Sequence, residues 1–124
     1  MQRLYKIMIA LVILGHIGFA GMQALAWPTV AERLLGLTDP EAVEKTASVG
    51  TSFASYNLSI AIGIGLSFLL TEGVREKIQL SVLSLIVFTA VVGFLGTGSM
   101  VILGGRLLPA TIALLLQIHL SRRS

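Results

Sequence analysis

Four long apolar stretches dominate the pattern of hydrophobic positions, roughly Ile7–Trp27, Ala47–Leu70, Ile78–Thr97 and Val101–Leu120, and they cover more than two thirds of the 124 residues. Each has about 20 residues, the length that an α-helix needs to cross a hydrocarbon layer of about 30 Å. Short links separate the last three stretches, and such links make sequential helices antiparallel neighbours. The pattern predicts an all-α fold: an integral membrane, antiparallel four-helix bundle forming one domain over residues 1–124.

The one long connection, residues 28–46, carries signals for short helices. Proline is tolerated in a first helical turn, so Trp27-Pro28 predicts a surface helix over Thr29–Leu35. Gly36 is placed to end it. In the segment Asp39–Glu41, a capping aspartate precedes a proline and a glutamate, which predicts that the helix of the second span starts several residues before it enters the lipid.

Composition supports a membrane protein and excludes several chemistries. With 55% hydrophobic residues, 12% charged residues and a mean hydropathy of +0.90, the chain cannot hide its apolar surface in a core of its own. It has no cysteine, which excludes disulfides, thiolate metal sites and cysteine nucleophiles. The pI near 9.8 does not indicate a nucleic-acid partner, because Arg and Lys stand at the span ends and form no basic face.

The basic residues predict an orientation. With four spans, the two termini and the middle loop share one side and carry six basic residues, against three on the other side. Positive charge accumulates in cytoplasmic loops, so both termini are predicted to be cytoplasmic, in a multi-pass protein of a bacterial inner membrane. The six are Arg3, Lys6, Arg75, Lys77, Arg122 and Arg123, and the three are Arg33, Lys45 and Arg106.

The first apolar stretch has a second interpretation. Arg3 and Lys6 precede it and Ala24-Leu25-Ala26 ends it, a pattern typical of a cleaved secretory signal. Its length favours a membrane helix that is not removed.

Polar residues at depth give the first candidate site. His16 lies near the middle of the first span, where a histidine is a functional candidate by default. Gln23 and Trp27 return to within about 20° of His16 around the helix, so the three form one stripe. Unpaired polar groups cannot face lipid, which predicts that the stripe faces the bundle interior. Tyr56 and Asn57 of the second span lie at nearly the depth of His16. They differ by 100° around their helix, so one of them is predicted to meet the stripe while the other turns toward the third or fourth span.

Arg106 stands about one turn inside the outer end of the fourth span, shortly before Pro109. It can snorkel outward, or it can reach into the bundle and hold an anionic or carbonyl group. The sequence leaves both open. No set of metal ligands is present. The predicted ligand-binding residues are His16, Gln23, Trp27, Tyr56, Asn57 and Arg106, with helix packing alone as the alternative role.

Over nearly its whole length the chain resembles a family of small four-span bacterial membrane proteins catalogued as a domain of unknown function. Members typically show Glu-His in the first span with an acid seven residues after the His and a Trp four later, Asn-Gln-Gly-Leu-Tyr-Asn in the second, and Gln-Gly-Leu-Pro in the fourth. The matching residues are His16, Trp27, Gly36-Leu37, Tyr56-Asn57 and Leu108-Pro109. The layout is also similar to that of DoxX-type proteins, some of which accompany quinone-linked respiratory enzymes.

The chain departs from that family at chemically important positions. Gly15 replaces the Glu beside the His, and Gln23 replaces the second acid. Ser52-Phe53 stands where the family has Asn-Gln, and Arg106 replaces the Gln before the proline. Two carboxylates are lost and a cation is gained. If those acids serve proton chemistry or cation binding in relatives, the resemblance implies that this protein has lost or changed that role.

Three function classes follow. We favour a bundle that binds a lipid or quinone-like lipophile in a polar pocket, or that serves as accessory subunit of a larger membrane complex. The alternatives are a small membrane enzyme with His16 as acid or base, and a transporter, which at four spans would need a homodimer. The expected partners are membrane lipid, a lipophilic small molecule and another membrane protein, with no nucleic acid. The cofactor is unknown: ligation of a haem by both His16 and His119 is geometrically poor because they lie at different depths, and a haem with a single ligand stays open.

Overall fold

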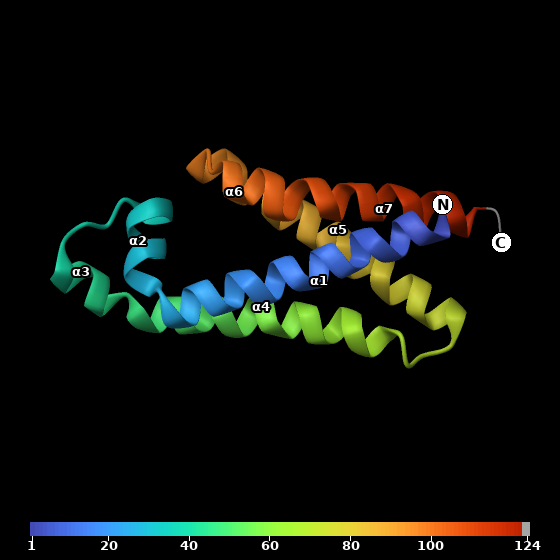
Figure 1. Cartoon of the computed structure of the whole chain (residues 1–124), viewed down its shortest axis with the longest axis horizontal. Coiled ribbons are helices and arrows are strands. Elements are labelled where there is room, and N and C mark those ends of the chain that lie inside the picture. Colours follow the sequence, from blue (N-terminus) through green and yellow to red (C-terminus); the bar gives the residue numbers. More distant parts are fainter. Residues whose placement is uncertain (123–124) are drawn as a thin grey trace.

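The protein is all-α in the computed structural model, which describes residues 1–122. Four helices are long and apolar enough to cross a membrane: α1 (Gln2–Leu25), α4 (Ala47–Ser67), α5 (Glu72–Thr97) and a composite fourth helix, Met100–Ser121. They run along the molecule, and the chain starts and finishes at the same end (Figure 1). The predicted fold class, an all-helical four-span membrane protein, is confirmed. The side of the membrane on which the termini lie stays a prediction.

Two spanning helices are longer than their apolar stretches. α1 begins at Gln2 and α5 at Glu72, several residues before the apolar segments that predict them. The added turns carry the charged residues of the inner end, here defined as the end of the bundle that holds both chain termini. The opposite end is the outer end. Helical geometry thus continues past the apolar region, because a polar first turn satisfies its free N–H groups from water or headgroups.

The long connection folds into two short helices, of which the sequence predicts the first as a separate helix. α2 (Trp27–Leu35) has Pro28 in its first turn and ends at Gly36, whose φ of 67° is left-handed. α3 (Pro40–Lys45) is capped by the Asp39 carboxylate, which accepts a hydrogen bond of 2.9 Å from the Ala42 N–H. The capping and stop residues therefore act as expected.

One detail of this connection corrects the prediction. α3 does not run on into the second span, because the helix is interrupted at Thr46. The Thr46 hydroxyl donates to the carbonyl oxygens of Ala42 and Val43, at 2.9 and 3.0 Å. A hydroxyl that binds the backbone of the preceding turn competes with regular helical bonding, so α3 and α4 are separate elements.

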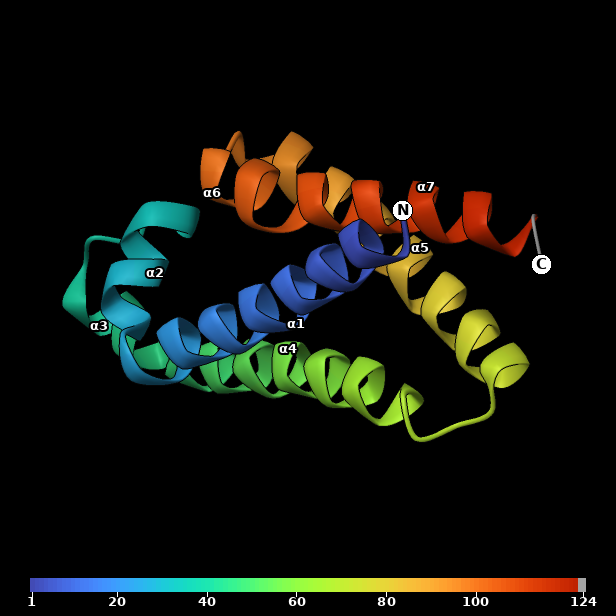
Figure 2. The ribbon, with the colours of Figure 1, turned by 45° about the vertical axis from the view of Figure 1, so that its right-hand side comes forward.

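Helix α1 is central to the packing. It contacts α4 along much of its length and also packs on the fourth helix, whereas α4 and α5 are joined at the inner end and diverge toward the outer end (Figure 2). The main apolar core surrounds the first half of α1 and is formed by Tyr5, Ile9, Val12, Ile64, Leu83, Ile86, Ala110 and Ala113. The second half of α1 carries His16 and Gln23, and Trp27 is the first residue of α2, so the predicted polar residues begin where this core ends.

The fourth helix contains a π-helical segment. α6 (Met100–Ile102) leads into η1 (Leu103–Leu107), followed by α7 (Leu108–Ser121). The Leu108 N–H bonds to the Leu103 carbonyl, five residues earlier, while Pro109 lacks an N–H and leaves the Gly105 carbonyl without its α-helical donor. That carbonyl faces α1: a Cβ placed on Gly15 would lie only 3.0 Å from its oxygen. The glycine lets α1 and η1 approach closely at mid-depth.

Candidate functional site

The predicted polar stripe of α1 faces the bundle interior. His16, Gln23 and Trp27 are all buried, and His16 has only 2% of its surface exposed. His16 and Gln23 lie along the face of α1 that packs between α4 and the fourth helix. The prediction that Trp27 continues the stripe on the same helix is wrong, because α1 ends at Leu25 and Trp27 begins α2. The orientation argued from the cost of unpaired polar groups is confirmed.

Asn57 is the residue of α4 that meets this stripe. Its Nδ2 donates to Gln23 Oε1 at 2.7 Å and to the Phe53 carbonyl at 3.0 Å. Its Oδ1 is buried and has no hydrogen-bond partner among the described residues. In the Gln23–Asn57 pair, Asn57 Oδ1 is thus free to accept a hydrogen bond.

His16 has a defined tautomer in its neutral form. Its Nδ1 lies 2.8 Å from the Val12 carbonyl oxygen, and a carbonyl can only accept, so Nδ1 carries the hydrogen. The other nitrogen, Nε2, then presents a lone pair. It is buried and unpartnered within residues 1–122, and therefore offers a second free acceptor.

Arg106 reaches into the bundle rather than toward the outer headgroups. Its Nη2 donates to Thr89 Oγ1 of α5 at 3.3 Å, and its buried Nε has no partner in the described chain. The ion pairs among residues 1–122 are Lys45–Glu41 and Arg75–Glu72, so no carboxylate neutralises Arg106. The close approach of Gly15 to the Gly105 carbonyl brings the segments that carry His16 and Arg106 together.

The other two predicted residues differ in role. Trp27 is held structurally: its indole N–H donates to Thr46 Oγ1 at 3.2 Å, and its ring stands edge-on to Phe53 at 6.4 Å between centroids. Tyr56 is 53% exposed and makes no hydrogen bond within residues 1–122, although it is an electrostatic neighbour of Arg106. Tyr56 therefore lies at the edge of the cluster, on the lipid-facing side.

The structure thus brings together four of the six predicted residues in two adjoining groups. Gln23 of α1 and Asn57 of α4 form the outer group. His16 of α1 and Arg106 of η1 form the group at mid-depth, with His16 about two helical turns from Gln23 on the same face of α1. We call these four residues the outer polar site. Together they leave two free acceptors, His16 Nε2 and Asn57 Oδ1, and one free donor, the Arg106 Nε–H.

Comparison with known proteins agrees with this architecture. Residues 10–118 match the model of a family described as "Protein of unknown function (DUF1304)". The chain belongs to this family. The match includes all six predicted site residues, and it confirms the resemblance to small four-span membrane proteins. Neither the curated proteins nor the solved structures gave a match.

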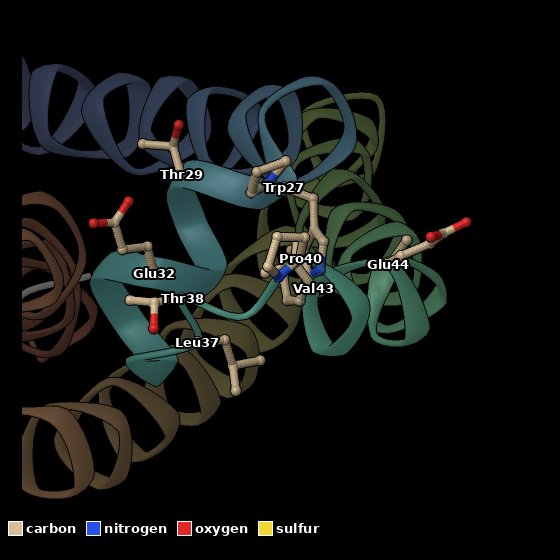
Figure 3. A pocket seen from close by; sticks show the side chains of 10 residues that line it. Trp27, Thr29, Glu32, Leu37, Thr38, Pro40, Val43 and Glu44 are labelled. Carbon is tan, nitrogen blue, oxygen red and sulfur yellow. The ribbon is translucent and has the colours of Figure 1, made fainter.

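A cavity of about 580 Å³ lies at the outer end of this DUF1304 protein. It opens between α2, α3 and the start of α4, and Trp27, Pro40 and Val43 gather at its centre (Figure 3). The carboxylates of Glu32 and Glu44 point to opposite sides of it. Because its charged groups do not converge, this cavity defines no binding chemistry of its own.

The sequence argument missed a second buried polar group at the inner end. The Tyr5 hydroxyl donates to Gln79 Oε1 at 2.6 Å, and Gln79 Nε2 donates to Ser67 Oγ at 2.9 Å. Ser67 donates in turn to the Ile64 carbonyl at 2.6 Å. The sequence signal that could have revealed this group is Gln79, a polar residue between Ile78 and Leu80. Its partners could not be predicted, because they lie on two other helices and no regular spacing in the sequence relates them to Gln79.

Proposed function

We propose that the protein binds a lipophilic molecule, a lipid or quinone-like compound, with its polar headgroup against the outer polar site. The supporting observation is the Arg106 guanidinium, which reaches into the bundle without a carboxylate partner in residues 1–122 and with a buried, unpaired Nε. Leaving a partly buried charge without a counter-charge is unfavourable, since the charge has lost part of its hydration. An anionic or carbonyl oxygen would remove that cost, and Arg is suited to grip it.

The unpaired donors and acceptors of the outer polar site restrict which headgroups can bind. His16 Nε2 and Asn57 Oδ1 both need a donor, whereas Arg106 needs an acceptor. A headgroup with oxygen acceptors alone would leave two buried acceptors unsatisfied, at a cost of about 1–3 kcal/mol each. The site therefore favours a headgroup that also carries a hydroxyl, as a quinol or a hydroxyl-bearing lipid does.

A small membrane enzyme is the second candidate, and one observation supports it. The bond from His16 Nδ1 to the Val12 carbonyl orients the ring and leaves the lone pair of Nε2 buried and unpartnered within residues 1–122. That is the orientation a general base needs, with a backbone carbonyl in place of the usual carboxylate. No contact of the described residues favours the accessory or transporter alternative in the same way.

Native purification in mild detergent, followed by mass spectrometry of retained lipophiles, tests the binding function. Arg106→Gln and His16→Gln should each lower the amount retained per folded protein by about tenfold, since each removes a hydrogen bond that includes a charge or a buried acceptor. Arg106→Lys should fall between, because it keeps the charge and loses the planar fork.

Arg33→Gln is the matched control, since Arg33 is exposed on α2 at the same end of the molecule. It should retain as much lipophile as wild type. Circular dichroism checks that each variant is folded. Equal retention in wild type, His16→Gln and Arg106→Gln would overturn the proposed function and leave these residues with a packing role.

A further inference from the structure

A second cavity, of about 570 Å³, lies at the inner end, far along the bundle from the outer polar site. We call it the inner cavity. Residues of α1, α5 and α7 line it, together with Phe68 at the end of α4. It shares no lining residue with the outer polar site, so it requires its own explanation.

The floor of the inner cavity is formed by buried polar side chains. Tyr5, Gln79 and Gln117 line it and are almost fully buried, with exposed fractions of 8%, 1% and 3%. The bonds from Tyr5 to Gln79 and from Gln79 to Ser67 lock this floor across three helices. Buried polar side chains held in this way form a preorganised surface that apolar acyl chains would not match.

The rim of the inner cavity carries both signs of charge. Lys6 and Arg75 are its cations, and Glu72 and Glu76 its anions. Arg75 pairs with Glu72 only loosely, at 3.7 Å, and both Arg75 and Glu76 are partly buried. Phe68 and Leu120 add apolar wall. A ligand that satisfies this rim needs a negative group, a positive group and an apolar portion.

We propose that the inner cavity binds the headgroup of a zwitterionic phospholipid with a primary ammonium, a phosphoethanolamine lipid. Its phosphate would lie against Lys6 and Arg75, its ammonium against Glu76, and its acyl chains along Phe68 and Leu120. The cavity volume is within the range of about 300–1,000 Å³ typical of small-molecule sites. Its position at the end of the spanning helices is the depth at which headgroups lie.

Other phospholipids satisfy the cavity less completely. An anionic phosphoglycerol lipid supplies no cation for Glu76. A phosphocholine lipid has a quaternary ammonium without N–H groups, so it cannot donate a charge-assisted hydrogen bond to the carboxylate. The mixed rim therefore predicts selectivity among headgroups as well as affinity for phosphate.

The test uses the full-length protein in mixed micelles with equimolar phosphoethanolamine, phosphocholine and phosphoglycerol lipids of identical acyl chains, and native mass spectrometry of the bound lipid. Wild type should retain the phosphoethanolamine lipid about fivefold over either competitor, as expected for a few charge-assisted hydrogen bonds. Glu76→Gln should bring that lipid and the phosphoglycerol lipid to parity. Arg75→Gln should lower the retained amounts of both lipids together. If Arg75→Gln does not fold, Lys6→Gln, at an exposed position, takes its place.

Lys45→Gln and Glu41→Gln are matched controls, because this exposed ion pair lies on α3 at the opposite end. They should leave the lipid ratios of wild type unchanged. A wild-type protein that retains the three lipids equally, or prefers the phosphoglycerol lipid, would overturn the proposal. An unchanged lipid ratio in the folded Glu76→Gln protein, or an unchanged amount of retained lipid in the folded Arg75→Gln protein, would do the same.

Discussion

Single residues decide how closely the outer half of the bundle can pack. Gly50 is the clearest case, because a Cβ at this position would lie 2.5 Å from two carbon atoms of the Trp27 ring and 3.0 Å from the Gln23 carbonyl oxygen. Trp27 is in turn fixed by its hydrogen bond to Thr46. The absence of a side chain at Gly50 therefore positions both the indole and the adjoining Gln23, which holds Asn57.

Gly50→Ala should destabilise the protein by about 1–3 kcal/mol, the range for inserting a methyl group where neighbours cannot yield. Trp27 is the sole tryptophan of the chain, so its fluorescence during thermal unfolding reports the change directly. Gly63→Ala in the same helix is the control, since a Cβ there meets nothing within 4 Å. Indistinguishable unfolding midpoints for the two variants would show that Trp27 does not depend on Gly50.

At the scale of elements, local signals predicted the connection between α1 and α4 well. Gly36, Asp39 and Pro40 each impose a backbone geometry or supply a hydrogen bond within a few residues, so their sequence positions suffice. The break at Thr46 was missed, because a threonine favours helix or interruption according to which carbonyl its hydroxyl finds. Local chemistry predicts where helices begin more reliably than where they bend.

The Asp39 cap has a measurable consequence for α3. Asp39→Ala removes the acceptor for the Ala42 N–H and should destabilise this short helix by about 1 kcal/mol. Amide hydrogen exchange at residues 42–46 should then be about fivefold faster, with exchange in α4 unaltered. Glu41→Gln, which leaves the cap in place, serves as control. An exchange rate in Asp39→Ala equal to that of Glu41→Gln would contradict this role.

At the scale of the whole molecule, the sequence predicted the spans and the face of α1, but not the relations between distant helices. Periodicity alone showed that His16 and Gln23 face inward, since lipid cannot satisfy them. It could not show that Arg106 turns toward Thr89, or that Tyr5 meets Gln79, because such pairs depend on the register between helices. The inner cavity escaped sequence reasoning for the same reason.

Both proposed sites depend on a bundle whose ends lie on opposite sides of a membrane. The residues of the outer polar site lie between the middle of the bundle and the end that carries α2 and α3, and the inner cavity lies at the end that holds both termini. The excess of basic residues at the latter end predicts that it is cytoplasmic.

Alkaline phosphatase fusions test this arrangement most directly, because the reporter is active only outside the cytoplasm. A fusion after residue 39, between α2 and α3, should give high activity, and one after residue 74, at the start of α5, should give low activity. Equal expression of the two fusions is verified by immunoblot. The reverse activities would contradict the orientation, and high activity at both positions would contradict the four-span bundle on which both sites rest.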